Sequence, residues 1–387
     1  MKWEPTCADG AGTTTKMVPT DDGGHILATY GQSMEVFSHG EVETLPPHRS
    51  TNHAIDLEPS NNLQYGGIYS LSEFKLRTLK AYIEANLANE FIQRSSSLAA
   101  APILCAKIRD GELRLCVDYR ALNLATVTNQ YPLPRISEML DCGQEARRMT
   151  KRDLRGAYNP IRTTEGDEYK KVFQMPYCQF EYWVMPFGLT ITHAMFQSYM
   201  GDYVQPYVDD FAVCSLAGIL MYSTNDTEHE EHVCQVRQHH REFGLYCKAE
   251  RGQFRLSEVG FLGLVITVDG VSMELDRITT MEDWPAPKSV RDVQVLHEFT
   301  NIYQRFIRKY AKVTLPLTEL LYKSETARAT KWEVSAKCEV TQEAELAFRR
   351  LNRTFTEAPI LQHCDRAKPI LVQPDPSGFP IAGILNE

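Results

Sequence analysis

Two short apolar runs on either side of two small residues constrain this chain more than any other feature. Residues 211–216 read FAVCSL, residues 219–222 read ILMY, and Ala217 and Gly218 stand between them. Apolar runs this short around a tight turn are typical of an antiparallel hairpin, whereas helices need a longer apolar pattern. The sequence therefore predicts a hairpin with Ala217 and Gly218 at its tip.

An acidic pair, Asp209 and Asp210, lies just before this hairpin in the stretch QPYVDD. A Tyr-x-Asp-Asp quartet is the signature with which many polymerases hold catalytic magnesium at a hairpin tip. Here Pro206 precedes the quartet, and proline is out of place inside a paired strand. The pattern therefore places both aspartates in a loop between a helix at residues 192–204 and the first strand. A catalytic role for the pair stays open as the alternative.

The rest of the chain alternates helical and strand patterns. Residues 1–60 are rich in Gly, Thr, Ser and Asp and are predicted to be a flexible leader. A helix is predicted where the apolar residues Leu76, Leu79, Ile83 and Leu87 keep helical spacing. Further predicted elements are hairpins at 101–123, 170–189, 258–273 and 368–387 and helices at 227–245 and 296–323.

Composition and charge narrow the class of protein. The chain has 387 residues, enough for two or three domains, and a formal net charge of −9, which leaves room only for a local basic channel. No apolar run is long enough to span a membrane, and the N-terminus has no secretory signal. Ten cysteines occur without a CxxC pair, which favours free thiols in a reducing compartment. We therefore expect an intracellular protein of the cytoplasm or nucleus that is not secreted.

A series of motifs follows in a fixed order from Leu45 to the C-terminus. They read LPPHRSTNHAIDL, LRLCVDYRALN, YPLPRISEML, FEYWVMPFGLT, FLGLVIT, DWPAPKSVRDVQ and YQRFIRKYAKVTLPLTELL. Together they closely resemble the reverse transcriptase region of a gypsy-like LTR retrotransposon Pol polyprotein. The resemblance implies an α/β (α+β) right-hand polymerase with fingers, palm and thumb, which copies RNA into DNA with two magnesium ions.

The same resemblance implies a domain order. Residues 1–60 would be a leader similar to a protease–polymerase linker, and residues 61–275 the fingers and palm. Residues 276–330 would be the thumb and connection, and residues 331–387 the first hairpin of an RNase H-like domain. Asp375 matches the first RNase H carboxylate, and the chain ends before the other acids of that site. We therefore expect a truncated RNase H segment without activity.

Site residues are carried over from the family position by position. Asp153 matches the first metal-binding aspartate, and Tyr158 matches the aromatic that screens out the ribose 2′-hydroxyl. Lys107 and Arg114 match residues that contact the triphosphate of the incoming nucleotide, and Phe187 matches the residue beneath that nucleotide. Gln197 is also assigned to nucleotide binding, and Gly263 matches the glycine that helps to place the primer.

The family's Tyr-x-Asp-Asp position falls on Ser215, Leu216, Ala217 and Gly218. Alanine and glycine supply no side-chain ligand, so Asp153 is left as the one carboxylate for two ions. Arg152 and Pro160 also depart from the family pattern. Arg152 should face away from Asp153 in a strand, towards packed helices. The resemblance thus predicts a degenerate, catalytically impaired copy.

Two groups of residues allow more than one interpretation. The first is the set His229, His232, Cys234, His239 and His240, which could hold zinc but is better explained as a polar helix face. The second comprises Lys107, Arg109 and Arg114 in one hairpin and Arg305, Arg308, Lys309 and Lys312 in a helical stripe. These could contact phosphates or be solvated surface.

Three functional hypotheses follow. The first is a reverse-transcriptase domain that is inactive as a polymerase. The second is an active polymerase that uses Asp209 or Asp210. The third is a nucleic-acid-binding or interaction module that keeps the fold without chemistry. Expected partners are an RNA template with a DNA primer or an RNA–DNA hybrid, dNTP and other parts of the polyprotein, with no membrane.

Overall fold

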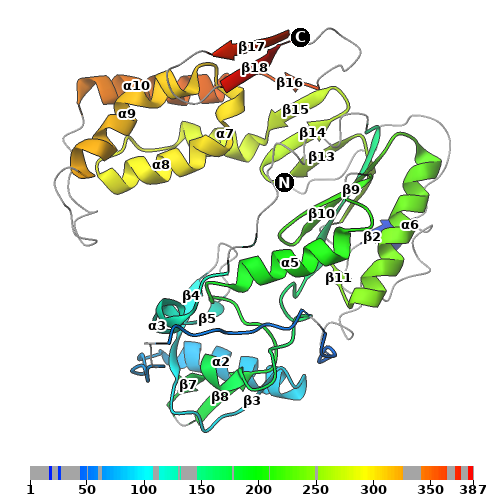
Figure 1. The fold of residues 1–387 in the computed structure, drawn as a ribbon, viewed down its shortest axis with the longest axis vertical. Coiled ribbons are helices and arrows are strands. Elements are labelled where there is room, and N and C mark those ends of the chain that lie inside the picture. The colour runs from blue at the N-terminus through cyan, green and yellow to red at the C-terminus, as the bar shows by residue number, and fades with distance from the viewer. Residues whose placement is uncertain are drawn as a thin grey trace. The chain divides into compact units, whose positions relative to one another are not determined.

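The computed structural model describes the chain over a set of ranges separated by gaps. These are residues 17–19, 25–27, 44–49, 51–59, 63–107, 113–129, 131, 146–176, 178–208, 210–248, 252–325, 341–363, 371–375 and 382–386. The chain divides into two compact units, residues 1–142 with 146–256 and residues 143–145 with 257–387 (Figure 1). Helices and sheets occur in both units, so the predicted mixed α/β fold is confirmed.

The fingers part of the first unit is a five-stranded sheet in the order β3-β8-β7-β4-β5. Its strands are β3 (Ile92–Arg94), β4 (Ala101–Lys107), β5 (Leu113–Val117), β7 (Phe173–Met175) and β8 (Cys178–Tyr182). The predicted helix is α2 (Glu73–Ala88), and its buried Leu79 and Ile83 share one apolar cluster with Phe173 and Phe180. Helical spacing therefore identified the middle of the packed face, whereas Leu76 and Leu87, which share the pattern, are exposed.

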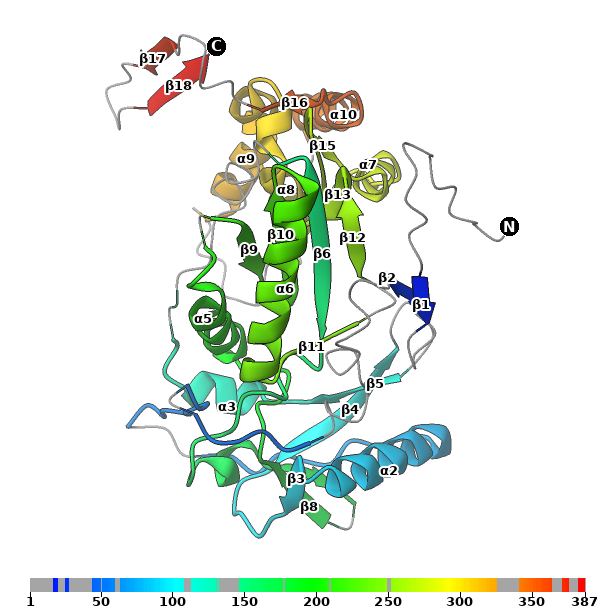
Figure 2. The same ribbon diagram turned by 90° about the vertical axis from the view of Figure 1, so that its right-hand side faces the viewer.

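The palm part of the same unit is built around β6 (Arg148–Arg155). The remaining palm strands are β9 (Ala212–Ser215), β10 (Gly218–Ser223), β11 (Tyr246–Cys247) and β12 (Gln253–Leu256). β10 pairs with one edge of β6, and β11 and β12 pair with the other edge (Figure 2). This arrangement makes β6 a central strand.

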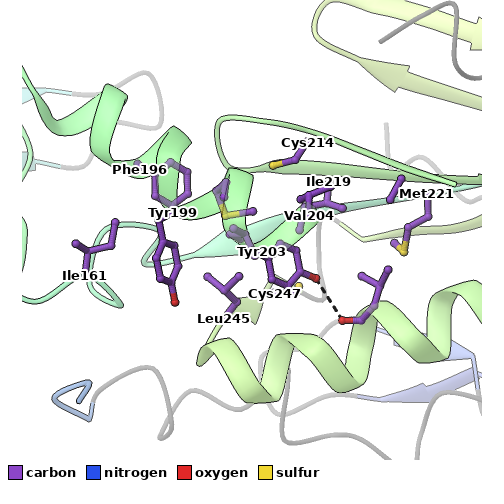
Figure 3. Packing of buried hydrophobic residues seen from close by; sticks show 14 of the residues in the cluster. Ile161, Phe196, Tyr199, Tyr203, Val204, Cys214, Ile219, Met221, Leu245 and Cys247 are labelled. Atoms are coloured by element: carbon purple, nitrogen blue, oxygen red, sulfur yellow. Dashed lines mark hydrogen bonds between the residues drawn. The ribbon is translucent and has the colours of Figure 1, made fainter. Parts of the chain in front are cut away.

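Two helices cover one face of the palm sheet. α5 (Thr192–Val204) packs on β9, and α6 (Asp226–Phe243) packs on β10 and β6. The Asn225 side chain accepts the Glu228 N–H at the start of α6, and Gly244 ends that helix in the left-handed conformation. Figure 3 shows Phe196, Tyr199 and Tyr203 of α5 in one apolar cluster with strand residues such as Ile219. The apolar hairpin residues are therefore buried under α5 and α6.

The described residues 44–49 and 51–59 lie within the stretch that the sequence assigned to a leader, and several of them are packed in the structure. His53 pairs with Thr163, and Leu57 pairs with Thr126 just beyond α3 (Arg120–Ala125). Ile55 is fully buried in an apolar cluster with Tyr119 and Leu122. This part of the chain therefore belongs to the folded first unit. Its neighbour at the fingers end is the short helix η2 (Glu168–Lys171).

The second unit holds a four-stranded sheet in the order β13-β14-β15-β16 and a set of helices. The strands are β13 (Glu258–Phe261), β14 (Leu264–Thr267), β15 (Gly270–Met273) and β16 (Leu361–Gln362). The helices are α7 (Leu275–Glu282), α8 (Val290–Ile302), η4 (Gln304–Phe306), α9 (Tyr310–Glu325) and α10 (Gln342–Thr356). The first unit ends at Leu256, whereas the sequence predicted that the fingers and palm extend to residue 275. β15 belongs to the second unit because it pairs with β16 from near the C-terminus.

Two further hairpins lie near the ends of the chain. β1 (Met17–Pro19) pairs with β2 (His25–Leu27), and β17 (Leu371–Asp375) pairs with β18 (Ala382–Asn386). The second matches the hairpin predicted at residues 368–387. None of the helices in the described ranges combines the length and the apolar character that a bilayer crossing needs.

Candidate functional site: the palm hairpin and its surroundings

The β9–β10 hairpin turns one residue earlier than the sequence predicted. Ser215 and Gly218 are paired across the two strands, so Leu216 and Ala217 form the tip in place of Ala217 and Gly218. Leu216 has a φ of 50°, in the left-handed region that a branched side chain rarely adopts. The two-residue connection requires this backbone conformation.

The hairpin tip lies beside Asp153. Gly218 is directly opposite Asp153 where β10 pairs with β6, and Ile219 is opposite Arg152. The Leu154 N–H donates to the carbonyl oxygen of Ala217 at 2.8 Å, which fixes the tip against the end of β6. Asp153 is half-buried. The structure thus brings together Asp153, Ala217 and Gly218.

Of the acidic pair, the structure describes Asp210, which lies elsewhere in the palm. Asp210 is exposed in the turns that connect α5 to β9, and its N–H donates to the carbonyl of Tyr207 at 3.3 Å. Asp209 lies outside the described residues. Asp210 precedes β9 and the hairpin tip follows β9, so the length of this strand lies between Asp210 and the tip. A four-residue strand spans about 13 Å.

Reverse transcriptases generally use divalent metal ions, and the described residues do not fit a two-ion site. Within the described ranges, no three His, Cys, Asp or Glu side chains gather closely enough to hold a metal ion. Asp153 supplies a carboxylate at the end of β6, whereas its neighbours across the hairpin are Ala217 and Gly218. A two-metal site needs shared carboxylates that hold both ions about 3.5–4 Å apart. We therefore derive no catalytic step through a metal.

An aromatic surface lies next to Asp153 in the chain. The Tyr158 ring is largely buried and meets the Phe187 ring edge-on, with centroids 4.6 Å apart. Phe196 supports Tyr158 from α5 at 5.1 Å, and burial raises the pKa of the Tyr158 hydroxyl. Phe187 is 61% exposed, so one aromatic face is open to a base or sugar. Tyr158 and Phe187, both predicted from the sequence, are neighbours.

Gln197 has a different position from the one expected of a nucleotide contact. Its side chain is 4% exposed, and its Oε1 accepts the N–H of Leu216 at 3.3 Å. The side chain therefore lies beneath the hairpin tip, where it satisfies a turn amide. Its predicted role in nucleotide binding stays a prediction, and the contact that the structure gives this side chain is with the turn.

The other predicted site residues are spread over the fold. Lys107 and Arg114 lie in the paired strands β4 and β5, opposite Leu113 and Ala106, and their side chains are outside the described residues. Gly263 turns between β13 and β14 with a φ of 83°, and an added Cβ would overlap the Tyr303 hydroxyl. Only glycine fits there without a shift.

Asp375 ends β17 opposite Ala382. Its side chain is outside the described residues, so its predicted RNase H role stays a prediction.

The histidine-rich helix α6 is explained by hydrogen bonding within the palm. His229 is buried, with Nε2 2.7 Å from Thr150 Oγ1 and Nδ1 2.9 Å from Ser223 Oγ, and burial lowers its pKa to about 4. His240 is also buried, and its Nδ1 lies 2.8 Å from the carbonyl of Val236. Both ring nitrogens of His229 are engaged in hydrogen bonds within the palm, which does not favour this residue as a zinc ligand.

The Arg152 side chain points away from the face that carries Asp153, as the sequence predicted. It is fully buried, and its guanidinium lies 5.4 Å from the centre of the Phe254 ring. Burial raises the pKa of the Cys247 thiol to about 11 although the nearby Arg152 charge opposes this shift. The alternation of β6 therefore sends Arg152 into the palm core and Asp153 to the opposite face.

Comparison with known proteins decides the family. Residues 106–266, which include Asp153 and the palm hairpin, match the family described as reverse transcriptase (RNA-dependent DNA polymerase). These residues are a reverse transcriptase domain. The chain is also 29% identical over 359 residues to the Tf2-7 and Tf2-8 transposon polyproteins of Schizosaccharomyces pombe. The chain is therefore similar to the reverse transcriptase region of a retrotransposon Pol polyprotein, as its motifs predicted.

The alignments cover 92% of this chain and 26% of each polyprotein, so the chain spans about a quarter of the length of these relatives. Solved structures show the same fold. A foamy viral protease–reverse transcriptase bound to double-stranded DNA matches 99% of this chain and 68% of its own, with a TM-score of 0.72 at 16% identity. The same viral protein bound to an RNA/DNA hybrid matches 100% of this chain and 54% of its own, with a TM-score of 0.69 at 15% identity.

Proposed function

We propose that this reverse transcriptase domain keeps the polymerase fold and lacks polymerase activity. The pairing of Gly218 with Asp153 carries the proposal, because it fixes which residues occupy the second carboxylate position. Ala217 and Gly218 are there, and neither has a side chain that can bind a cation. Magnesium held by Asp153 alone would lack the shared carboxylates of a two-ion site.

A nucleic-acid-binding role without catalysis is the second candidate. Arg305, Arg308, Lys309 and Lys312 are all exposed around η4 and the start of α9 in the second unit. The open face of Phe187 in the first unit offers a stacking surface. Each of these surfaces, taken by itself, suits an RNA template paired with a DNA primer, and the foamy viral structures bound to hybrid and duplex DNA support this partner. Contacts of Lys107 and Arg114 with a dNTP, and of the chain with other polyprotein parts, belong to this proposal.

The third candidate, an active polymerase that uses Asp209 or Asp210, has less support. Asp210 is exposed at the far end of β9 from the hairpin tip. Carboxylates at that end cannot share ions with Asp153 unless the hairpin register changes.

Two measurements on the unaltered chain separate these candidates. The first is extension of a DNA primer on an RNA template with and without magnesium, in which we expect no detectable product. The second is binding of an RNA–DNA hybrid without metal, in which we expect weak binding that declines steeply with salt. Extension that is lost in Asp210→Ala would support the third candidate. Absence of both activities would leave an interaction module as the remaining function.

A further inference from the structure

One segment of the chain contacts both the palm and the fingers of the first unit. This segment, the strap, comprises the described residues 46–49 and 51–57, and Arg49 attaches it to the palm. The Nη2 of Arg49 donates to the carbonyl of Glu242 at 3.0 Å, near the end of α6. Its guanidinium also lies 5.3 Å from the Phe243 ring centre and 5.9 Å from that of Tyr199. The planar cation is therefore held by one hydrogen bond and two aromatic neighbours.

The other end of the strap is attached to the fingers by a charged pair. The N–H of Ile55 donates to Asp167 Oδ2 at 2.7 Å, and its carbonyl accepts from Lys170 Nζ at 2.7 Å. Asp167 and Lys170 are themselves paired at 2.5 Å, with side chains only 16% and 15% exposed. Both polar backbone groups of Ile55 are thus bound by one ion pair, and its side chain is buried.

Between these attachments, the strap lies along the chain segment that follows Tyr158. The His53 N–H donates to the carbonyl of Arg162 at 2.7 Å, and the Thr164 N–H donates to the carbonyl of His53 at 2.9 Å. Arg162 Nη1 also donates to the carbonyl of Pro46 at 3.3 Å. The loop that carries Tyr158 therefore runs directly into residues that the strap holds.

We infer that the strap fixes the fingers relative to the palm and thereby positions the Tyr158 loop, with Arg49 and the Asp167–Lys170 pair as its positioning residues. A segment attached at both ends limits how far the two sheets can move apart. Loss of either attachment leaves the strap held only by its remaining contacts, such as the hydrogen bonds of His53. The inference rests on the packing of the first unit and needs neither catalysis nor nucleic acid.

The test measures the distance between the two parts in the full chain. Spin labels are placed on Cys234, which is exposed on α6, and on a cysteine that replaces the exposed Ser96 of the fingers. Other accessible cysteines are changed to serine. Arg49→Gln and Asp167→Ala should each broaden the distance distribution relative to the labelled parent. Exposed positions outside the strap supply the matched controls Arg291→Gln and Asp202→Ala, which should leave the width unchanged.

A conservative variant separates positioning from simple packing. Arg49→Lys keeps a donor for the Glu242 carbonyl and loses the planar stack, so its distribution should be narrower than that of Arg49→Gln. Hydrogen exchange gives a second measurement. In Asp167→Ala the amides of Ile55 and Thr164 should exchange faster, while those within α5 and α6 keep their rates. Unchanged widths in both Arg49→Gln and Asp167→Ala, with or without a lower melting temperature, would overturn the inference.

Discussion

Gly218 lies directly opposite Asp153 across the paired strands β10 and β6. A side chain at this position would start from the face of the sheet that carries the Asp153 side chain. Asp153 therefore has no carboxylate opposite it on the paired strand, where our proposal expects a further metal ligand. Substitution at this position tests the proposed lack of activity.

Restoring the missing carboxylates should restore polymerase chemistry in part. The change is Ser215→Tyr with Ala217→Asp and Gly218→Asp, which brings three carboxylates to the hairpin tip. Charge stabilisation by bound metal is worth several kcal/mol, so we expect primer extension to rise by roughly a thousandfold or more over the unaltered chain. Recovery should stay incomplete, because Arg152 and Pro160 remain beneath and beyond Asp153. The measurement is magnesium-dependent extension on an RNA template.

The repaired chain also tests the acidic pair. Adding Asp210→Ala to the repaired chain should leave its extension rate unchanged, whereas adding Asp153→Ala should abolish extension. If Asp210→Ala removed the recovered activity, the assignment of Asp210 to a surface turn would be wrong. If the repaired chain had the circular dichroism spectrum of the unaltered chain and still gave no extension, the missing carboxylates would not be the main defect.

Removing the support beneath the hairpin tip should destabilise the palm. Gln197→Ala leaves the Leu216 N–H without its partner in a partly buried turn. Such a loss costs about 1–3 kcal/mol, which urea unfolding measures as a lower midpoint. Gln205→Ala is the matched control, because Gln205 is exposed at the end of the same helix. Its effect should stay within about 0.5 kcal/mol. Equal effects for the two variants would argue against the positioning role of Gln197.

Stability should fall in mild acid partly because of His53. Burial lowers the pKa of His53 to about 3, and the positive charge of Lys171 contributes. An unfolded histidine has a pKa near 6.5, so below this pH the unfolded chain binds a proton that the folded chain does not. The free energy of unfolding therefore declines as the pH falls from about 6.5 towards 3.

His53→Leu removes this contribution and isolates it from the other buried histidines. Between about pH 6 and pH 4, the unaltered chain should lose up to about 1.4 kcal/mol per pH unit more than the variant. Urea unfolding over a pH series measures the difference. His193→Leu, at an exposed position, serves as the control and should keep the parental slope. Parallel pH profiles for His53→Leu and the parent would refute the prediction.

The basic residues around η4 should carry part of any hybrid binding. Arg305→Gln with Arg308→Gln removes two exposed cations, so the slope of log affinity against log salt should become shallower by about 0.7–0.9 for each phosphate that these cations neutralise. The control is Arg349→Gln with Arg353→Gln. Both of these arginines are exposed on α10 and paired with glutamates, at 2.6 Å and 3.0 Å. Identical slopes for the two double variants would show that the basic residues are solvated surface.

Local patterns predicted the elements and the directions of side chains within them. The alternation of a strand was enough to send Arg152 to the face opposite Asp153, and helical spacing was enough to bury Leu79 and Ile83. The hairpin tip was wrong by one residue, because small residues such as Ala217 and Gly218 mark a turn without fixing which pair closes it. Pairing with β6 fixes the register, and that partner is remote in sequence.

Contacts between distant segments could not be read from any local pattern. Gln197 resembles a nucleotide contact by its place in the motif, and its burial depends on a turn nineteen residues away. The strap lies in a stretch rich in polar residues and proline, a composition that predicts a flexible leader. Its order depends on Glu242, Asp167 and Lys170, which are more than a hundred residues further along the chain.

Leu216 holds a left-handed backbone that costs a residue with a side chain about 1–2 kcal/mol. The neighbours that would bind a metal are absent, and the turn keeps this conformation through strand pairing and Gln197. The shape of the turn is thus independent of the chemistry that such a turn can support. It follows that two folds of this kind can superimpose closely while one catalyses and the other does not. Competence has to be judged from the side chains on the turn, and a few substitutions are enough to change it in either direction.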